Sequence, residues 1–378
     1  MYVTIGNFFS TFFGALLWFF LATQMSASTY GGLNYYISIA AVFTAIGIMG
    51  FDSTLTTFIA KGVSKMRIES ATVVLIAGII LSIVLFIIFN SFSLVLAFLG
   101  VLFFSMSTAD LLGLHRYKEF MYLLIIERTI SLISVPLLFW LGGIDGALYG
   151  YAISYLPLCY RFFNSLRKVD LSISSIIKIK SFFIHSYGLG LSKTFAYSSD
   201  KLLIMPIFGL ELLGYYQFGI QMLTTLSIIP LILYNYLLPQ YSGGKNKNLP
   251  ELELYGIAIS VVFTILMVIA MPLIIGKLFP TFHQAIVPTQ LVLFAGIPLT
   301  VTAIYNSFFM AREKSVYVIA GATIFLASQF SLLLILGSIF GLLGLSAATF
   351  LASTIQSVFL FLMKRRMRTT SPIKKVDP

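Results

Sequence analysis

The chain has 378 residues, of which 59% are hydrophobic and only 10% are charged, and its mean hydropathy is +0.98. A soluble domain carries about 25% charged residues, so this composition excludes a soluble protein and predicts a polytopic membrane protein. The net charge of +11 does not indicate a nucleic-acid partner, because the basic residues gather at the ends of apolar runs.

The apolar runs are continuous, without the polar–apolar alternation of barrel strands, and this predicts membrane helices. Twelve runs reach the length of about 20 residues that a bilayer requires. The first lacks the basic flank of a cleavable signal and is too long for one, so we expect a first transmembrane helix there. The twelve runs lie near residues 4–24, 33–60, 71–90, 92–109, 121–141, 144–164, 183–208, 215–241, 253–275, 286–311, 316–338 and 343–363.

Positive charge is distributed unequally between the gaps that separate these runs. Of the 24 Lys and Arg residues, 20 lie in the even-numbered gaps and the C-terminal tail, if Arg161 near the end of the sixth run is counted with the gap that follows it. One (Lys277) lies in an odd-numbered gap, and three lie deeper within spans. The positive-inside rule therefore predicts a multi-pass protein of the cytoplasmic (plasma) membrane with both termini in the cytoplasm. The basic tail, residues 364–378, could bind anionic lipid headgroups, although an orientation signal alone explains it.

The chain reads as two similar halves. The longest polar connection, Ser165 to Ser181, divides it into a first bundle of six helices (1–164), a cytoplasmic linker (165–182), a second bundle of six helices (183–363) and the tail. Equal numbers of spans in each half give the two copies the same orientation, so we expect a parallel repeat. Two local patterns support the repeat: Tyr30-Gly31 with Tyr35-Tyr36 matches Leu213-Gly214-Tyr215-Tyr216, and Gly143-Ile-Asp-Gly146 matches Gly341-Leu-Leu-Gly344.

Three basic residues fall at bilayer depth, where a charge costs roughly 2.5–3.5 kcal/mol unless it faces a cavity or a partner. Arg128 and Lys193 are candidate substrate-binding residues, because Arg and Lys hold anionic groups such as phosphate. Lys201 is a weaker candidate, since its long side chain can reach the interface.

Three acidic residues accompany them: Asp52, Glu127 and Asp200. They could balance the positive charge or carry a coupling proton or Na⁺. The alternative is that they form internal ion pairs, such as Asp52 with Arg128, that hold helices in place.

Signals for other chemistry are absent from the sequence. The histidines, His115, His185 and His283, lack ligand spacing, which predicts no metal site, and the single cysteine, Cys159, lies in an apolar run. There is no Gly-rich phosphate loop, and the gaps that we place outside the cell are too short for a catalytic domain. We therefore expect no enzyme activity and no cofactor.

The stretch Ser199-Asp200-Lys201-Leu-Leu-Ile, followed by Gly209, Leu213-Gly214-Tyr215-Tyr216 and Leu238-Pro239, resembles the polysaccharide transporter family. These are the lipid-linked oligosaccharide (O-antigen type) flippases of the multidrug/oligosaccharidyl-lipid/polysaccharide exporter (MOP) superfamily. Gly47-Ile-Met-Gly50-Phe-Asp52 resembles the first repeat of the same family.

The resemblance implies an all-α polytopic fold of about twelve transmembrane helices in two six-helix bundles, similar to that of the MATE exporters. It implies a V-shaped alternating-access transporter whose partners are a glycan on an isoprenoid pyrophosphate, the bilayer and glycan-assembly proteins. Three alternatives stay open: a cation-coupled multidrug exporter of the same fold, a membrane-embedded glycan polymerase or transferase, and a scaffold of an envelope complex.

Overall fold

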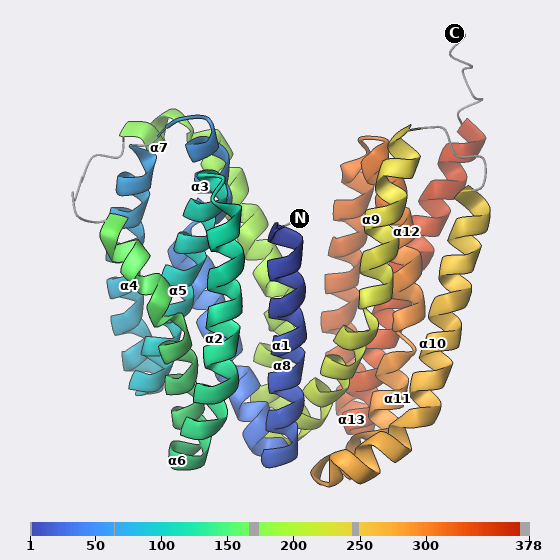
Figure 1. The fold of residues 1–378 in the computed structure, drawn as a ribbon. Coiled ribbons are helices and arrows are strands. Elements are labelled where there is room, and N and C mark those ends of the chain that lie inside the picture. Colours follow the sequence, from blue (N-terminus) through green and yellow to red (C-terminus); the bar gives the residue numbers. More distant parts are fainter. Residues whose placement is uncertain (1, 64, 166–173, 244–248, 371–378) are drawn as a thin grey trace. The chain divides into compact units, whose positions relative to one another are not determined.

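The computed structural model describes residues 2–63, 65–165, 174–243 and 249–370 (Figure 1). All regular elements in these ranges are helical. They are α1 (Tyr2–Gln24), α2 (Ala27–Ile48), α3 (Phe51–Ala60), α4 (Met66–Phe89), α5 (Phe92–Gly113), α6 (Tyr117–Ser165), α7 (Ser174–Lys178), α8 (Lys180–Leu226), α9 (Ile228–Gly243), α10 (Leu249–Leu278), η1 (Pro280–Ala285, a 3-10 helix), α11 (Ile286–Leu293), α12 (Gly296–Ala311) and α13 (Ser315–Thr370).

Nine helical stretches within the described residues are long and apolar enough to cross a membrane. Three of them, Tyr117–Pro157, Lys180–Gly243 and Ser315–Met367, have 41, 64 and 53 residues, which is enough for two crossings each. Each of the three is interrupted by a glycine with non-helical backbone angles. Counting these three twice gives twelve spans and confirms the predicted all-α polytopic class.

The chain forms two compact units. Unit 1 contains residues 1–24 and 32–205, and unit 2 contains residues 25–31 and 206–378. The division therefore falls inside α8, between Met205 and Pro206, whereas the sequence suggested a division in the linker at 165–182. Residues 166–173 of that linker lie outside the described residues.

The first part of α8 packs in unit 1 because aromatic side chains join it to α3. The rings of Phe51 and Phe183 lie 4.9 Å apart between centroids, and those of Phe58 and Phe182 lie 5.2 Å apart. These contacts explain why residues 183–205, which the sequence placed in the second bundle, group with the first.

The predicted second span is broken into α2 and α3. Met49 and Gly50 both take positive φ, 51° and 78°, and α3 begins at Phe51. Asp52 therefore lies in the first turn of a short helix that starts inside the span. The dipole of a helix stabilises a carboxylate in that position by about 0.3–1 kcal/mol.

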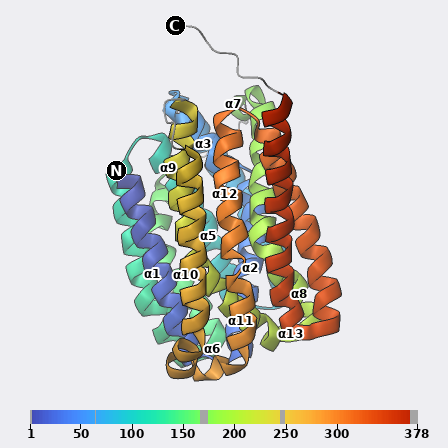
Figure 2. The same cartoon turned by 90° about the vertical axis from the view of Figure 1, so that its right-hand side faces the viewer.

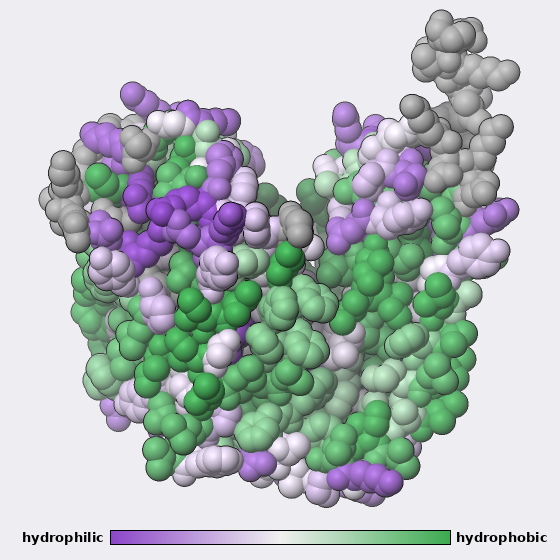
Figure 3. Space-filling model, in the orientation of Figure 1, coloured by the Kyte–Doolittle hydropathy of each residue, from purple (hydrophilic) through white to green (hydrophobic). Residues whose placement is uncertain are grey.

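The interior of unit 1 is organised around α5, which packs against α3, α4 and α6. The ring of Phe103 stacks on Phe162 of α6 at 4.4 Å between centroids. By contrast, α4 exposes a row of isoleucines, including Ile80, Ile83 and Ile87, as expected for a surface that faces lipid. Figure 3 shows a hydrophobic band over the helices of unit 1 and hydrophilic residues gathered around α3 and α7 at one end.

In unit 2, α12 packs against α9, α10 and α13, and these helices run side by side (Figure 2). Their core includes Leu237, Ile304, Phe309 and Leu360. Lys364, which the sequence counted with the basic tail, is 5% exposed and pairs with Glu253 at 2.6 Å. Helix α13 thus continues to Thr370, and residues 371–378 of the tail lie outside the described residues.

The two halves share an unusual local geometry at the second pattern proposed as a repeat. Gly143 in α6 has φ 59° and ψ −138°, and Gly341 in α13 has φ 56° and ψ −130°. This region of backbone conformation is accessible essentially only to glycine. Three residues later, Gly146 and Gly344 each lie so near a carbonyl oxygen, of Leu138 and Leu336, that a Cβ would come within 1.8 Å of it.

The first repeat pattern is in direct contact with its own counterpart. Gly31 of α2 packs on the carbonyl oxygen of Leu210, and Gly214 of α8 packs on that of Ala27. In each helix, the glycine lies four residues after the residue whose carbonyl oxygen the other glycine contacts. The matched glycines of the two halves therefore meet in one reciprocal contact, and all four residues belong to unit 2.

Candidate functional site

Arg128 lies in α6 within a stretch that can cross the membrane. Its Nε donates a hydrogen bond to Oγ of Ser10 in α1 at 3.0 Å and lies 3.3 Å from Oε2 of Glu127. The Glu127 side chain is fully buried, whereas 29% of the Arg128 side chain is exposed. Ser10 and Glu127 thus hold the Nε edge of the guanidinium.

Lys193 and Lys201 of α8 differ in their surroundings. Nζ of Lys201 lies 3.3 Å from Oδ1 of Asp200 and donates to the carbonyl oxygen of Tyr197 at 2.6 Å. The Lys193 side chain is exposed and forms no ion pair with another described residue. Lys193 can therefore meet an external anion at lower cost than Lys201, whose charge is already balanced.

Asp52 faces a groove of about 490 Å³ between α3 and α5. Its Oδ1 atom is buried and accepts no hydrogen bond from the described residues. The expected pairing of Asp52 with Arg128 is not formed, because Arg128 pairs with its neighbour Glu127. Among the six candidates, the structure brings together Glu127 with Arg128 and Asp200 with Lys201, and all six lie in unit 1.

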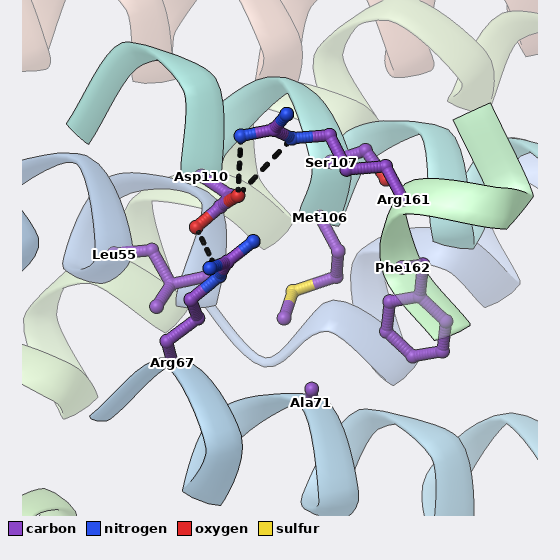
Figure 4. A pocket seen from close by; sticks show the side chains of 8 residues that line it. All are labelled: Leu55, Arg67, Ala71, Met106, Ser107, Asp110, Arg161 and Phe162. Carbon is purple, nitrogen blue, oxygen red and sulfur yellow. Dashed lines mark hydrogen bonds and ion pairs between the residues drawn. The ribbon is translucent and has the colours of Figure 1, made fainter. Parts of the chain in front are cut away.

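A charged cluster that the sequence did not predict lies at the end of unit 1 where α5 ends and α6 begins (Figure 4). Asp110 of α5 lies 2.8 Å from Arg67 of α4 through Oδ1 and 3.2 Å from Arg161 of α6 through Oδ2. Arg161 also pairs with Glu119 at 3.2 Å. The space among these side chains is only about 10 Å³, so the cluster is a packed junction of three helices and not a ligand cavity.

A signal for this junction was present in the sequence. Asp110 follows an apolar run directly, and Arg67 and Arg161 were counted only as orientation charges. A second buried acid, Glu69 of α4, accepts hydrogen bonds from the backbone and hydroxyl of Ser175 in α7, at 3.0 and 3.1 Å. Acids that flank apolar runs beside basic loops are therefore candidates for pairing between helices.

No cluster of three or more His, Cys, Asp or Glu side chains with metal-binding geometry occurs among the described residues. The candidates instead offer fixed cations, Arg128 and Lys193, and a groove with one carboxylate. The cations can recognise an anionic group, and the groove can accept hydrogen bonds from donors.

No family model matches the sequence, and no curated protein matches it. Solved structures do match the fold. A structure described as "Lipid II flippase MurJ, inward closed conformation" superposes with a TM-score of 0.75 at 15% identity, covering 96% of this chain and 87% of that chain.

Two transporters of the MOP superfamily also match. An inward-facing multidrug resistance MATE family transporter has a TM-score of 0.71 at 15% identity, with 98% and 96% of the two chains covered. A MOP superfamily transporter from Pyrococcus furiosus, described as having a binding pocket of reverse polarity, has a TM-score of 0.59 at 14% identity, with 97% and 94% covered. The chain therefore has the all-α fold shared by MurJ and the MATE transporters, as its sequence resemblance implied.

Proposed function

We propose that this protein is a flippase that moves a lipid-linked oligosaccharide, carried on an isoprenoid pyrophosphate, across the cytoplasmic membrane during synthesis of a cell-surface polysaccharide. The fold that it shares with MurJ and MATE transporters supports transport by alternating access. In this proposal the protein is not an enzyme, both termini are cytoplasmic, and glycan-assembly proteins supply and consume the cargo.

The observation that carries the proposal is a cation, Arg128, whose side chain is 29% exposed inside a membrane-spanning stretch. Glu127 and Ser10 orient it, and its remaining N–H groups can donate to pyrophosphate oxygens. Lys193 supplies a second cation, which forms no ion pair with another described residue. Lys201 contributes to the positive electrostatic potential around the substrate but keeps its ion pair with Asp200.

The acidic residues then have distinct roles in the proposal. Glu127 and Asp200 balance the charges of Arg128 and Lys201, since each lies next to its partner. Asp52 balances no cation among the described residues, so its role differs from that of Glu127 and Asp200.

A multidrug exporter is the second candidate, because a MATE transporter matches the fold closely. Sites for hydrophobic cations are lined mainly by apolar and aromatic side chains. The residues that line the Asp52 groove are mostly hydroxyl-bearing and include no aromatic ring, which favours a glycan over an apolar drug.

Neutralising Arg128 and Lys193 tests the proposal. Because Arg128→Gln alone would leave Glu127 buried without its partner, the variant is Glu127→Gln/Arg128→Gln/Lys193→Gln. Each charge-assisted hydrogen bond contributes roughly 1.5–3 kcal/mol, so we expect glycan export to fall about tenfold or more. Surface glycan and lipid-linked glycan in the cytoplasmic leaflet are measured in cells whose own gene is deleted.

Lys277→Gln is the matched control, because Lys277 is an exposed lysine in α10 far along the chain from the candidates. It should export as the wild type does. Normal export by the triple variant, at wild-type protein level in the membrane, would contradict the role of Arg128 and Lys193 in holding the cargo.

A further inference from the structure

The groove between α3 and α5 is polar although both helices belong to stretches that we place in the membrane. Five hydroxyl side chains and one carboxylate line it. Its volume of about 490 Å³ lies in the range of small-molecule sites. The polar lining residues are Asp52, Ser53, Thr56, Thr57, Ser105 and Thr108.

Most of these hydroxyl groups already donate a hydrogen bond to a backbone carbonyl oxygen. Thr56 and Thr57 donate to the carbonyl oxygens of Asp52 and Ser53, at 2.8 and 2.9 Å. Ser105 and Thr108 donate to carbonyl oxygens one turn earlier in α5, at 2.9 and 3.1 Å. A hydroxyl oxygen that donates to its own helix retains its lone pairs, so it presents an acceptor to a ligand.

Asp52 adds the strongest acceptor of the groove. It lies in the first turn of α3, and its buried Oδ1 accepts no hydrogen bond from described residues. An unsatisfied buried acceptor is costly, and a ligand that donates to it would remove that cost. The groove is thus rich in acceptors and poor in donors.

We infer that this groove binds the sugar hydroxyl groups of the transported glycan, with Asp52 as its principal acceptor. The inference rests on the proposed flippase function and identifies where the carbohydrate part of the cargo is held. Each sugar hydroxyl can donate one hydrogen bond, which matches a surface of acceptors. A single desolvated metal ion fits worse, since it needs oxygen ligands at about 2.3–2.6 Å on all sides and not an open groove of this size.

The test compares two probes: a polyprenyl diphosphate that carries a disaccharide and the same polyprenyl diphosphate without sugar. Native mass spectrometry of the full chain gives the affinity for each. The variant Ser105→Ala/Thr108→Val removes two acceptors without changing charge, and Asp52→Asn removes the carboxylate. Because it loses two hydrogen-bond acceptors, the double variant should bind the sugar-bearing probe about tenfold more weakly.

Binding of the bare probe should be unchanged in these variants, which also shows that they are folded. Thr323→Val is the matched control, because the Thr323 hydroxyl makes the same kind of bond to its own helix, to the Ile319 carbonyl oxygen at 3.0 Å, outside the groove. It should bind both probes as the wild type does.

Two results would overturn the inference and leave the flippase proposal standing: a wild type that binds both probes equally, or groove variants that retain the preference for sugar. Loss of cation-dependent transport in Asp52→Asn, with the sugar preference intact, would instead make Asp52 a coupling residue and would also overturn it. A wild type that binds neither probe would overturn the inference and the proposed function together.

Discussion

Replacement of Gly214 by alanine should greatly reduce the amount of folded protein in the membrane. A Cβ at this position would lie 1.8 Å from the carbonyl oxygen of Ala27, and backbone atoms cannot move away as a flexible side chain can. The start of α2 and residues 210–214 of α8 would have to separate. Overpacking a tight interior typically costs about 1–3 kcal/mol, and a clash of this depth should reach the upper part of that range or exceed it.

Yield after mild detergent extraction and the midpoint of thermal unfolding measure this effect. Gly31→Ala should also lower the yield and the unfolding midpoint, because its Cβ would lie 2.1 Å from the carbonyl oxygen of Leu210. Gly276→Ala is the control: Gly276 is in α10 with nothing within 4 Å of a built Cβ, so it should be neutral or slightly stabilising. Wild-type yield and midpoint for Gly214→Ala would show that the reciprocal contact is not needed.

Asp110→Asn should destabilise unit 1 by about 3 kcal/mol. The change leaves the guanidinium groups of Arg67 and Arg161 facing each other without the carboxylate that separates them. Breaking a buried ion pair by removing one partner costs roughly 3–5 kcal/mol, and we take the lower end because 32% of the Arg67 side chain is exposed.

Unfolding by a denaturing detergent measures this change in stability. Combining Asp110→Asn with Arg161→Gln should recover part of the loss, because the two guanidinium groups then no longer face each other. Glu251→Gln, an exposed acid at the start of α10, should have little effect. If Asp110→Asn were as stable as the wild type, the junction of α4, α5 and α6 would not depend on these ion pairs.

The overall class could be predicted from the sequence because continuous apolar runs and glycines are local signals. The matched glycines Gly31 and Gly214 were recognised as a repeat, and the structure shows them in contact. The break at Met49–Gly50 was not predicted, because an apolar run continues through it and only the positive φ values reveal it. The unit boundary inside α8 depends on ring contacts such as Phe51 with Phe183, which join residues far apart in the sequence.

The candidate site was predicted in part. The pair of Asp200 with Lys201 is local and was considered as an alternative. The hydrogen bond from Arg128 to Ser10 requires α1 to lie beside α6, which no pattern indicates. The ion pairs of Asp110 were not predicted for the same reason, since its partners come from α4 and α6. Charges on different helices can be matched only when the packing is known.

Transport by the purified full chain in vesicles tests the central claim most directly. A fluorescent polyprenyl diphosphate disaccharide is placed in both leaflets, and its transfer to the opposite leaflet is followed by chemical quenching from outside. We predict that the wild type accelerates transfer and that Glu127→Gln/Arg128→Gln/Lys193→Gln does not. The opposite result would be that the wild type does not move this lipid but does move a hydrophobic cationic dye. That result would contradict the flippase account and favour the multidrug exporter.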